Sequence, residues 1–213
     1  MSKEAVSIIG SSDGPTSVFM TGGKHKTNIK QKIQKKSFEL RKKWYALWIK
    51  PNPHTMAEVA EYIREKYDFV ELTKESPKYQ QLYKELRSSF VMQYEPQLLG
   101  EYAALPELKN QNEEDIKVFL DAMRVRQEKA SEVPEELFSL DYYYFEKQDR
   151  DLHIELQLEA RFEYIGGSTS GKKLSKFNKI YKDVYKYYGV SDYDIKNQTK
   201  RYENLLRQLA MQH

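Results

Sequence analysis

The chain has 213 residues, of which 39% are hydrophobic, 31% are charged and 13% are aromatic, and its mean hydropathy is −0.82. This length suits one domain of good size, or a small domain with an arm. The absence of cysteine excludes disulfides and cysteine metal sites and fits a reducing cytoplasm. No apolar run reaches the ~18 residues that span a bilayer, and polar residues interrupt the first apolar stretch, so we expect a cytoplasmic protein without a signal peptide or a membrane partner.

The net charge of +3 conceals a strong segregation of charge along the chain. Residues 24–50 hold ten Lys and Arg against one acid, and residues 172–207 hold ten against four. Residues 51–171 hold 14 Lys and Arg against 25 Asp and Glu. Basic ends around an acidic centre indicate charged partners, and they say nothing about the fold.

The first 23 residues are predicted to form a separate leader. Two short apolar pieces, Ile8-Ile9 and 18–20, flank the turn-forming segment 11–16. Asp13 and Pro15 are typical turn residues, and Gly14 between them tolerates a positive φ. We therefore expect two short extended pieces around a turn, followed by a flexible hinge at 21–23.

The next four segments are predicted to be helices. Residues 24–49 form a basic amphipathic helix, which Pro51 and Pro53 end. Its apolar residues at helical spacing are Ile29, Ile33, Leu40, Trp44 and Leu47 or Trp48. Three further helices begin at N-terminal capping signals: a capping box at 55–58, Ser76 before a first-turn proline, and Asn112 before three acids. They are expected to end near residues 67, 92 and 130.

The hydrophobic period changes to two after residue 137. From Leu152 to Tyr164 every even position is apolar or aromatic and every odd position is polar, which is typical of a strand. Residues 138–144 alternate as well, so an antiparallel hairpin at about 137–165 is predicted. Leu, Glu and Gln favour helix, and a helix over 152–165 therefore stays open.

Residues 166–171, Gly-Gly-Ser-Thr-Ser-Gly, are predicted to be a flexible loop. With the next two lysines they resemble the phosphate-binding loop of nucleotide hydrolases, but Lys173 stands where a Ser or Thr should hold magnesium. Helices are expected at 174–188, ended by Gly189, and from a cap at Ser191 to about residue 209. The predicted fold class is α+β and predominantly α-helical: a helical body with one long antiparallel hairpin and two C-terminal helices. The segments are a leader at 1–23, a basic helix at 24–50 and a mainly helical domain at 51–213.

Basic and aromatic residues suggest a nucleic-acid interface at both ends of the chain. Lysines neutralise phosphates, and tryptophans stack on unpaired bases. The alternative is a solvated basic face with both tryptophans in the core. The candidate residues are Lys24, Lys26, Lys30, Lys32, Lys35, Lys36, Arg41, Lys42, Lys43, Trp44, Trp48, Lys172, Lys173, Lys176 and Lys179.

The polar face of the predicted strand offers the only catalytic candidates, His153, Glu155, Glu159 and Arg161. A histidine and carboxylates on one face are suited to acid–base work or to holding a metal ion. The alternative is the solvated face of a half-exposed sheet. Neither a metal site nor a cofactor is predicted, and the sequence favours a binding protein over an enzyme.

The leader carries a resemblance, in Ser12, Asp13, Gly14, Pro15 and Thr16 with their apolar flanks. This segment resembles a motif of the membrane subunits of sodium-translocating decarboxylases, whose multi-span body is absent here. It is also similar to a leader on mobile-element proteins of Gram-positive bacteria, including some type II-A anti-CRISPR proteins. The second resemblance implies an inhibitor of a type II CRISPR effector nuclease whose leader is a docking handle.

Two modes of inhibition stay open. The basic ends can bind guide RNA and block assembly, or the acidic middle can mimic DNA in the effector's basic channel. Two other functions are alternatives: an RNA-acting nuclease that uses His153, Glu155 and Glu159, and a nucleic-acid-binding accessory protein of conjugation, whose affinity for DNA would fall steeply with salt.

Overall fold

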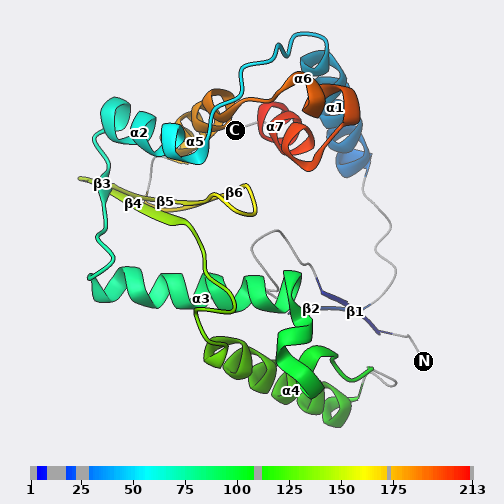
Figure 1. Ribbon diagram of the computed structural model, residues 1–213. Coiled ribbons are helices and arrows are strands. Elements are labelled where there is room, and N and C mark those ends of the chain that lie inside the picture. The colour runs from blue at the N-terminus through cyan, green and yellow to red at the C-terminus, as the bar shows by residue number, and fades with distance from the viewer. Residues whose placement is uncertain (1–3, 9–17, 23–28, 108–111, 172–173, 212–213) are drawn as a thin grey trace. The chain divides into compact units, whose positions relative to one another are not determined.

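The computed structural model describes residues 4–8, 18–22, 29–107, 112–171 and 174–211. The chain forms two compact units, each built from two stretches of sequence (Figure 1). Residues 1–25 and 73–140 form one, here called the helical unit, and residues 26–72 and 141–213 form the other, the sheet unit. Among the described residues, no helix is long and apolar enough to cross a membrane.

The helical unit is built around two long helices, α3 (Pro77–Tyr94) and α4 (Glu113–Glu132), with the short 3-10 helix η1 (Pro96–Ala103) between them in the chain. The predicted starts at Ser76 and Asn112 are confirmed, and the Asn112 side chain accepts a hydrogen bond from the Asp115 amide at 2.7 Å. Buried Arg87 of α3 donates to the carbonyl groups of Val133, Pro134 and Phe138. One guanidinium group therefore fixes the chain that follows α4.

Two short strands of the leader pair with each other in the same unit. β1 (Glu4–Ile8) and β2 (Val18–Gly22) are antiparallel, with Ile8 opposite Val18. This pairing confirms the two extended pieces. β2 continues through Gly22, so the predicted hinge at 21–23 is wrong at its first two residues. The predicted turn, with Ser12, Asp13, Gly14, Pro15 and Thr16, lies outside the described residues.

The sheet unit contains a four-stranded antiparallel sheet in the order β3-β4-β5-β6. The strands are β3 (Val70–Glu71), β4 (Tyr142–Asp149), β5 (Leu152–Glu159) and β6 (Tyr164–Gly171). Every second residue of β5 from Leu152 to Leu158 is apolar and buried, and these side chains form the sheet's contribution to the hydrophobic core. The alternation therefore reflects a strand with one buried face, and the alternative of a helix over 152–165 is wrong.

Among its described residues, the sheet unit also contains five helices: α1 (Ile29–Ala46), α2 (Met56–Tyr67), α5 (Leu174–Tyr188), α6 (Asp192–Asn197) and α7 (Lys200–Ala210). Apolar residues of α2, α5 and α7 join the core of the sheet, and Figure 1 shows α2 and α5 over one face of it. The capping boxes at Thr55 and Ser191 are present as predicted. α5 ends before Gly189, whose φ is +57°, as predicted.

The mixed, mainly helical fold class is confirmed, and three finer expectations are wrong. The sheet extends beyond one hairpin, because residues 166–171 form β6 against β5 and no loop. The strand that begins at Leu152 ends at Glu159, where residues 160–163 turn the chain. The C-terminal region has three helices, because Gln198 takes a left-handed conformation and Thr199 caps a new helix.

Candidate nucleic-acid interface

One side of α1 packs against the rest of the sheet unit. Tyr45 and Ala46 are partly buried against the core, and Arg41 Nε donates to the carbonyl oxygen of Ala210, at the end of α7, at 2.7 Å. The Lys182 ammonium of α5 lies 5.5 Å from the centre of the Tyr45 ring. These contacts determine which side of α1 faces solvent.

The solvent-facing side of α1 and of the turn after it carries an exposed apolar stripe. Trp44 is 55% exposed and Trp48 is 67% exposed, and their ring centres lie 6.2 Å apart. The alternative that places both tryptophans in the core is therefore wrong. At 3.6 residues per turn they share one stripe with the other large apolar residues of this side. These residues, all more than half exposed, are Ile33, Leu40 and Leu47.

Lysines border this stripe along one flank. Lys32, Lys36 and Lys43 are exposed and follow one another at helical spacing beside it. Among the described residues, no carboxylate lies within 4.0 Å of any of these three ammonium groups. Their charge is therefore available to an anionic ligand.

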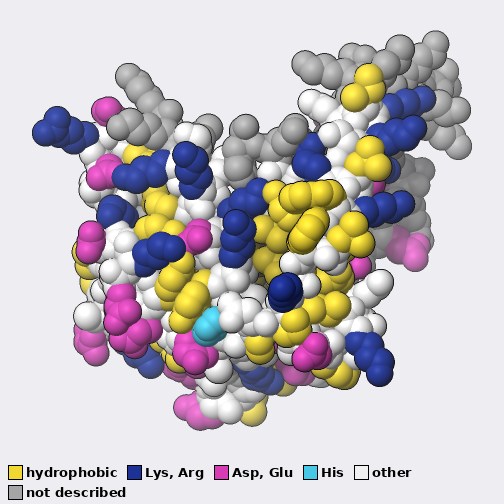
Figure 2. Space-filling model, turned by 90° about the horizontal axis from the view of Figure 1, so that it is seen from above, with side chains coloured by type: hydrophobic (Ala, Val, Ile, Leu, Met, Phe, Trp, Pro, Cys, Tyr) yellow, Lys and Arg dark blue, Asp and Glu magenta, His cyan; other side chains and the backbone are white. Residues whose placement is uncertain are grey.

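A groove of about 750 Å³ lies on the other flank, between α1, α5 and the end of α7. Aromatic rings form part of its wall: the rings of Phe177 and Tyr181 stack at 5.3 Å. Its lining residues are Gln34, Lys35, Phe38, Arg41, Phe177, Asn178, Tyr181, Lys182, Gln208 and Met211. Figure 2 shows the face of the molecule above these helices, where hydrophobic side chains lie open among Lys and Arg.

Cations crowd this groove. The pKa of Lys182 is lowered by burial first, and then by the positive charges of Lys186 and Arg41. A nearby positive charge disfavours the charged form of a lysine. The positive charges of Lys182, Lys186 and Arg41 therefore lie close together at this groove.

The remaining basic candidates are distributed as follows. Lys176 forms an ion pair with Asp149, which neutralises it, whereas Lys179 is exposed on α5. Lys35 and Lys42 lie on α1, and Lys30 is in its first turn. Lys24, Lys26, Lys172 and Lys173 lie outside the described residues.

The four catalytic candidates of the sheet separate into two places. His153 and Glu155 of β5 lie close to Glu146 of β4, with one ligand atom of each within 4.8 Å of the others. Glu159 is completely buried, and Arg161 is exposed in the turn after β5. The structure therefore brings two of the four together with a third residue that the sequence pattern did not indicate. Glu146 lies on another strand, so only the β4–β5 register shows that it is close to His153 and Glu155.

Glu159 is held by backbone amides. Its Oε1 accepts from the amides of Asp141 and Arg161, and its Oε2 accepts from the amide of Phe162. Burial raises the pKa of Glu159, and the three amides counteract part of this rise. The alternative of a solvated side chain is wrong for Glu159, because its buried carboxylate accepts hydrogen bonds from backbone amides at the turn that ends β5.

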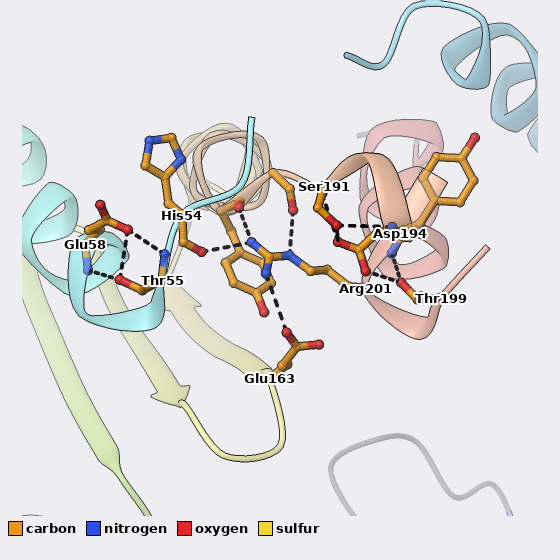
Figure 3. Close-up of polar contacts among 11 residues, drawn as sticks. His54, Thr55, Glu58, Glu163, Ser191, Asp194, Thr199 and Arg201 are labelled. Carbon is orange, nitrogen blue, oxygen red and sulfur yellow. Dashed lines mark hydrogen bonds and ion pairs between the residues drawn. The ribbon is translucent and has the colours of Figure 1, made fainter. Parts of the chain in front are cut away.

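Arg201 of α7 forms a polar cluster that no local sequence signal indicated (Figure 3). Its guanidinium donates to the carbonyl groups of His54, Tyr188 and Gly189, and it lies 3.7 Å from the centre of the Tyr188 ring. These contacts join α7 to the end of α5 and to the segment before α2. Because carbonyl groups take up its donors, Arg201 holds the fold together rather than offering a site for a ligand.

The exposed tryptophans, the lysine row and the aromatic, cationic groove together present exposed ring faces and positive charge, the two features that characterise surfaces for single-stranded nucleic acids. Comparison of the chain with protein-family models, with curated proteins and with solved structures finds no match.

Proposed function

We propose that the protein binds single-stranded nucleic acid, RNA in particular, along α1. The observation that carries the proposal is the exposure of Trp44 and Trp48 beside a row of lysines without carboxylate partners among the described residues. Base stacking on an aromatic ring contributes about 1–3 kcal/mol per base, and the lysines contribute the salt-dependent part of the affinity. The groove beside α1 takes a phosphate with an adjoining base.

A single strand fits this surface better than a duplex. Bases in a duplex are stacked on each other and hide the faces that an indole ring would contact, whereas unpaired bases offer them. The two indoles, one in the last turn of α1 and one in the turn after it, can therefore receive neighbouring unpaired bases.

The target is proposed from the leader. Because the leader resembles that of type II-A anti-CRISPR proteins, the proposed ligand is the guide RNA of a type II CRISPR effector. The protein then inhibits the nuclease in the bacterial cytoplasm, by holding the guide or the effector and blocking assembly or DNA binding. Acidic residues of 51–171 that mimic DNA remain the competing mode.

The first test measures binding of a fluorescently labelled single-stranded RNA by anisotropy. The variant Trp44→Ala/Trp48→Ala should bind at least about tenfold more weakly, because it loses both stacking surfaces. Tyr193→Ala on α6 is the matched control, since Tyr193 is an aromatic residue with 70% exposure. Equal loss in both variants, or no loss in either, would contradict the proposed interface. Because the chain has only two tryptophans, quenching of the wild type's indole fluorescence reports this surface directly.

The second test asks whether the target is the guide. Purified type II effector, guide RNA and target DNA are combined with the protein added before or after guide loading, and the guide is examined on a denaturing gel. Protection of the DNA only in the first order, with an intact guide, is expected. Protection in both orders would favour DNA mimicry, and a shortened guide would favour a nuclease. No protection in either order would contradict inhibition of that effector and leave RNA binding to the first test.

A further inference from the structure

We propose that Glu146, His153 and Glu155 form a binding site for a divalent transition-metal ion, Zn²⁺ or Mn²⁺. The site lies on the face of the sheet opposite to the hydrophobic core. It is separate from the α1 surface, so the inference does not depend on the proposed function.

The strand register brings the three side chains together. Glu146 of β4 is directly opposite Glu155 of β5, and directly opposite residues project from the same face of a sheet. His153 precedes Glu155 by two residues and projects from that face too. One ligand atom from each residue lies within 4.8 Å of the others.

The separations suit a shared metal ion better than a direct hydrogen bond. His153 Nε2 lies 3.9 Å from Glu146 Oε2, which is beyond hydrogen-bond distance. With metal–ligand bonds of about 2.0–2.2 Å, two ligand atoms of one ion lie at most about 4.4 Å apart. An ion between these atoms therefore requires only small side-chain rotations.

The surroundings orient the ligands and leave the site accessible. Ser168 of β6 donates a hydrogen bond of 2.6 Å to Glu155 Oε2, which holds one carboxylate from a third strand. A hydrogen bond of this kind, from outside the ligand set, fixes the orientation of a metal ligand. The side chains of Glu146 and His153 are each about a third exposed, so solvent and ions reach them.

The donor set determines the class of metal. One imidazole nitrogen and two carboxylates suit zinc or manganese, whereas magnesium and calcium prefer ligand sets made of oxygen alone. Three protein ligands also leave at least one coordination position for water or an external ligand.

The test titrates Zn²⁺, and separately Mn²⁺, into the full chain by isothermal calorimetry. We expect one ion per chain for wild type, and an affinity at least about tenfold lower for His153→Ala, Glu146→Gln and Glu155→Gln. Gln148→Ala is the control, because Gln148 lies beside the cluster, opposite His153, and offers no strong ligand. It should bind like wild type.

The outcomes are separable from those of the first proposal. Gln has nearly the same side-chain shape as Glu, so these variants should fold. Circular dichroism without metal, together with unchanged RNA binding, verifies that they are folded. Absence of measurable metal binding by wild type overturns the proposal. Binding that His153→Ala leaves unchanged overturns it too, because another histidine, His25, His54 or His213, would then hold the ion. Loss of RNA binding in Trp44→Ala/Trp48→Ala leaves the metal titration unchanged.

Discussion

Asp183 on α5 shows how one carboxylate joins two helices. One of its oxygens, Oδ2, accepts hydrogen bonds from the hydroxyl groups of Tyr62 and Tyr67 at 2.5 Å and from Lys66 Nζ at 2.7 Å. Burial by itself raises the pKa of Asp183, but these hydrogen bonds from α2 outweigh it and lower the pKa below its ordinary value. The charged form is therefore the one that the folded protein stabilises.

Asp183→Asn should lower the free energy of unfolding at pH 7 by about 1–2 kcal/mol, because a partly exposed charge cluster is screened by solvent. The folded-state pKa of Asp183 lies below the unfolded value of about 3.9. Its stabilisation is thus present above that value and is lost as the pH falls through the folded pKa. The difference in the free energy of unfolding between wild type and Asp183→Asn, measured in urea, should be smaller at pH 3 than at pH 7. Asp121→Asn on α4 is the control, and a difference independent of pH would contradict the role of the charge.

Glu159 should respond to pH in the opposite direction. Its folded pKa is raised, chiefly by burial, so the folded state takes up a proton at a higher pH than the unfolded state does. This group therefore adds stability as the pH falls from neutral towards the unfolded value of about 4.3. Glu159→Gln removes that gain, so its stability should vary less between pH 7 and pH 5 than that of wild type. Urea unfolding at both values measures it, and parallel curves would contradict the prediction.

The three amides that donate to Glu159 give a second, larger effect. Glu159→Ala leaves them without the carboxylate, and each partly buried amide left unpaired costs about 1 kcal/mol or more. The free energy of unfolding, measured in urea, should therefore fall by about 3 kcal/mol or more. Glu159→Gln should lose less because it keeps one acceptor oxygen.

At the scale of elements, the sequence predicts helix starts well because their causes are local. A cap at Thr55, Asn112 or Ser191 depends on amides within three residues of it, so four letters of sequence contain most of the interaction. The strand β6 has no such local cause. Its composition is that of a loop, and it becomes a strand because β5 offers an edge and because Tyr181 and Tyr185 donate to the carbonyl group of Ile165.

The candidate site follows the same division. The basic and aromatic composition of α1 could be read from the sequence, but the direction of its apolar stripe could not. Periodicity shows that a helix has two faces, and only packing decides which one is covered. Here α7 and α5 cover the side with Phe38, Arg41 and Tyr45, which leaves the tryptophans outside.

Gly189 provides a test of how α5 ends. Its φ is +57°, and a Cβ there would lie 2.0 Å from the carbonyl oxygen of Asn52. Gly100 is a control for space: its φ is +56° and its ψ is −122°, and a Cβ there would meet no atom within 4 Å. Residues with a Cβ rarely adopt such a backbone conformation, so Gly100→Ala should by itself cost about 1–3 kcal/mol of stability. Gly189→Ala adds a collision with the main chain, so it should cost more in urea unfolding, and equal losses would show that the contact with Asn52 is unimportant.

The lysine row of α1 makes a salt-dependence prediction. Log affinity for a single strand falls with log salt by about 0.7 per neutralised phosphate. Replacing Lys32, Lys36 and Lys43 by Gln should therefore reduce the slope by about 2. The control replaces three exposed lysines of the helical unit, Lys74, Lys84 and Lys117, and so changes the net charge equally. The same reduction in both variants would mean that net charge, rather than the α1 surface, determines binding.

At the scale of the whole molecule, charge is divided between the two units. Residues 73–140 hold nine Lys and Arg against 13 Asp and Glu, so the positive charge of the chain belongs to the sheet unit. The stacking surface and the groove lie in this same unit. A nucleic acid should therefore bind the sheet unit alone, although each unit is made of two stretches that alternate along the chain.

Hydrogen exchange of the full chain with a saturating single-stranded RNA tests this division. A ligand at about 100 times its Kd adds about 2.7 kcal/mol to the stability of the part that binds it. Amides of β4 and β5 that exchange only when the sheet unit opens should then exchange about 100-fold more slowly, because the stabilisation divides their open population by that factor. Amides of α3 and α4 should keep their rates, since their unit gains no ligand. Slowing confined to α3 and α4 would contradict the α1 interface, and equal slowing everywhere would show that the two units open together.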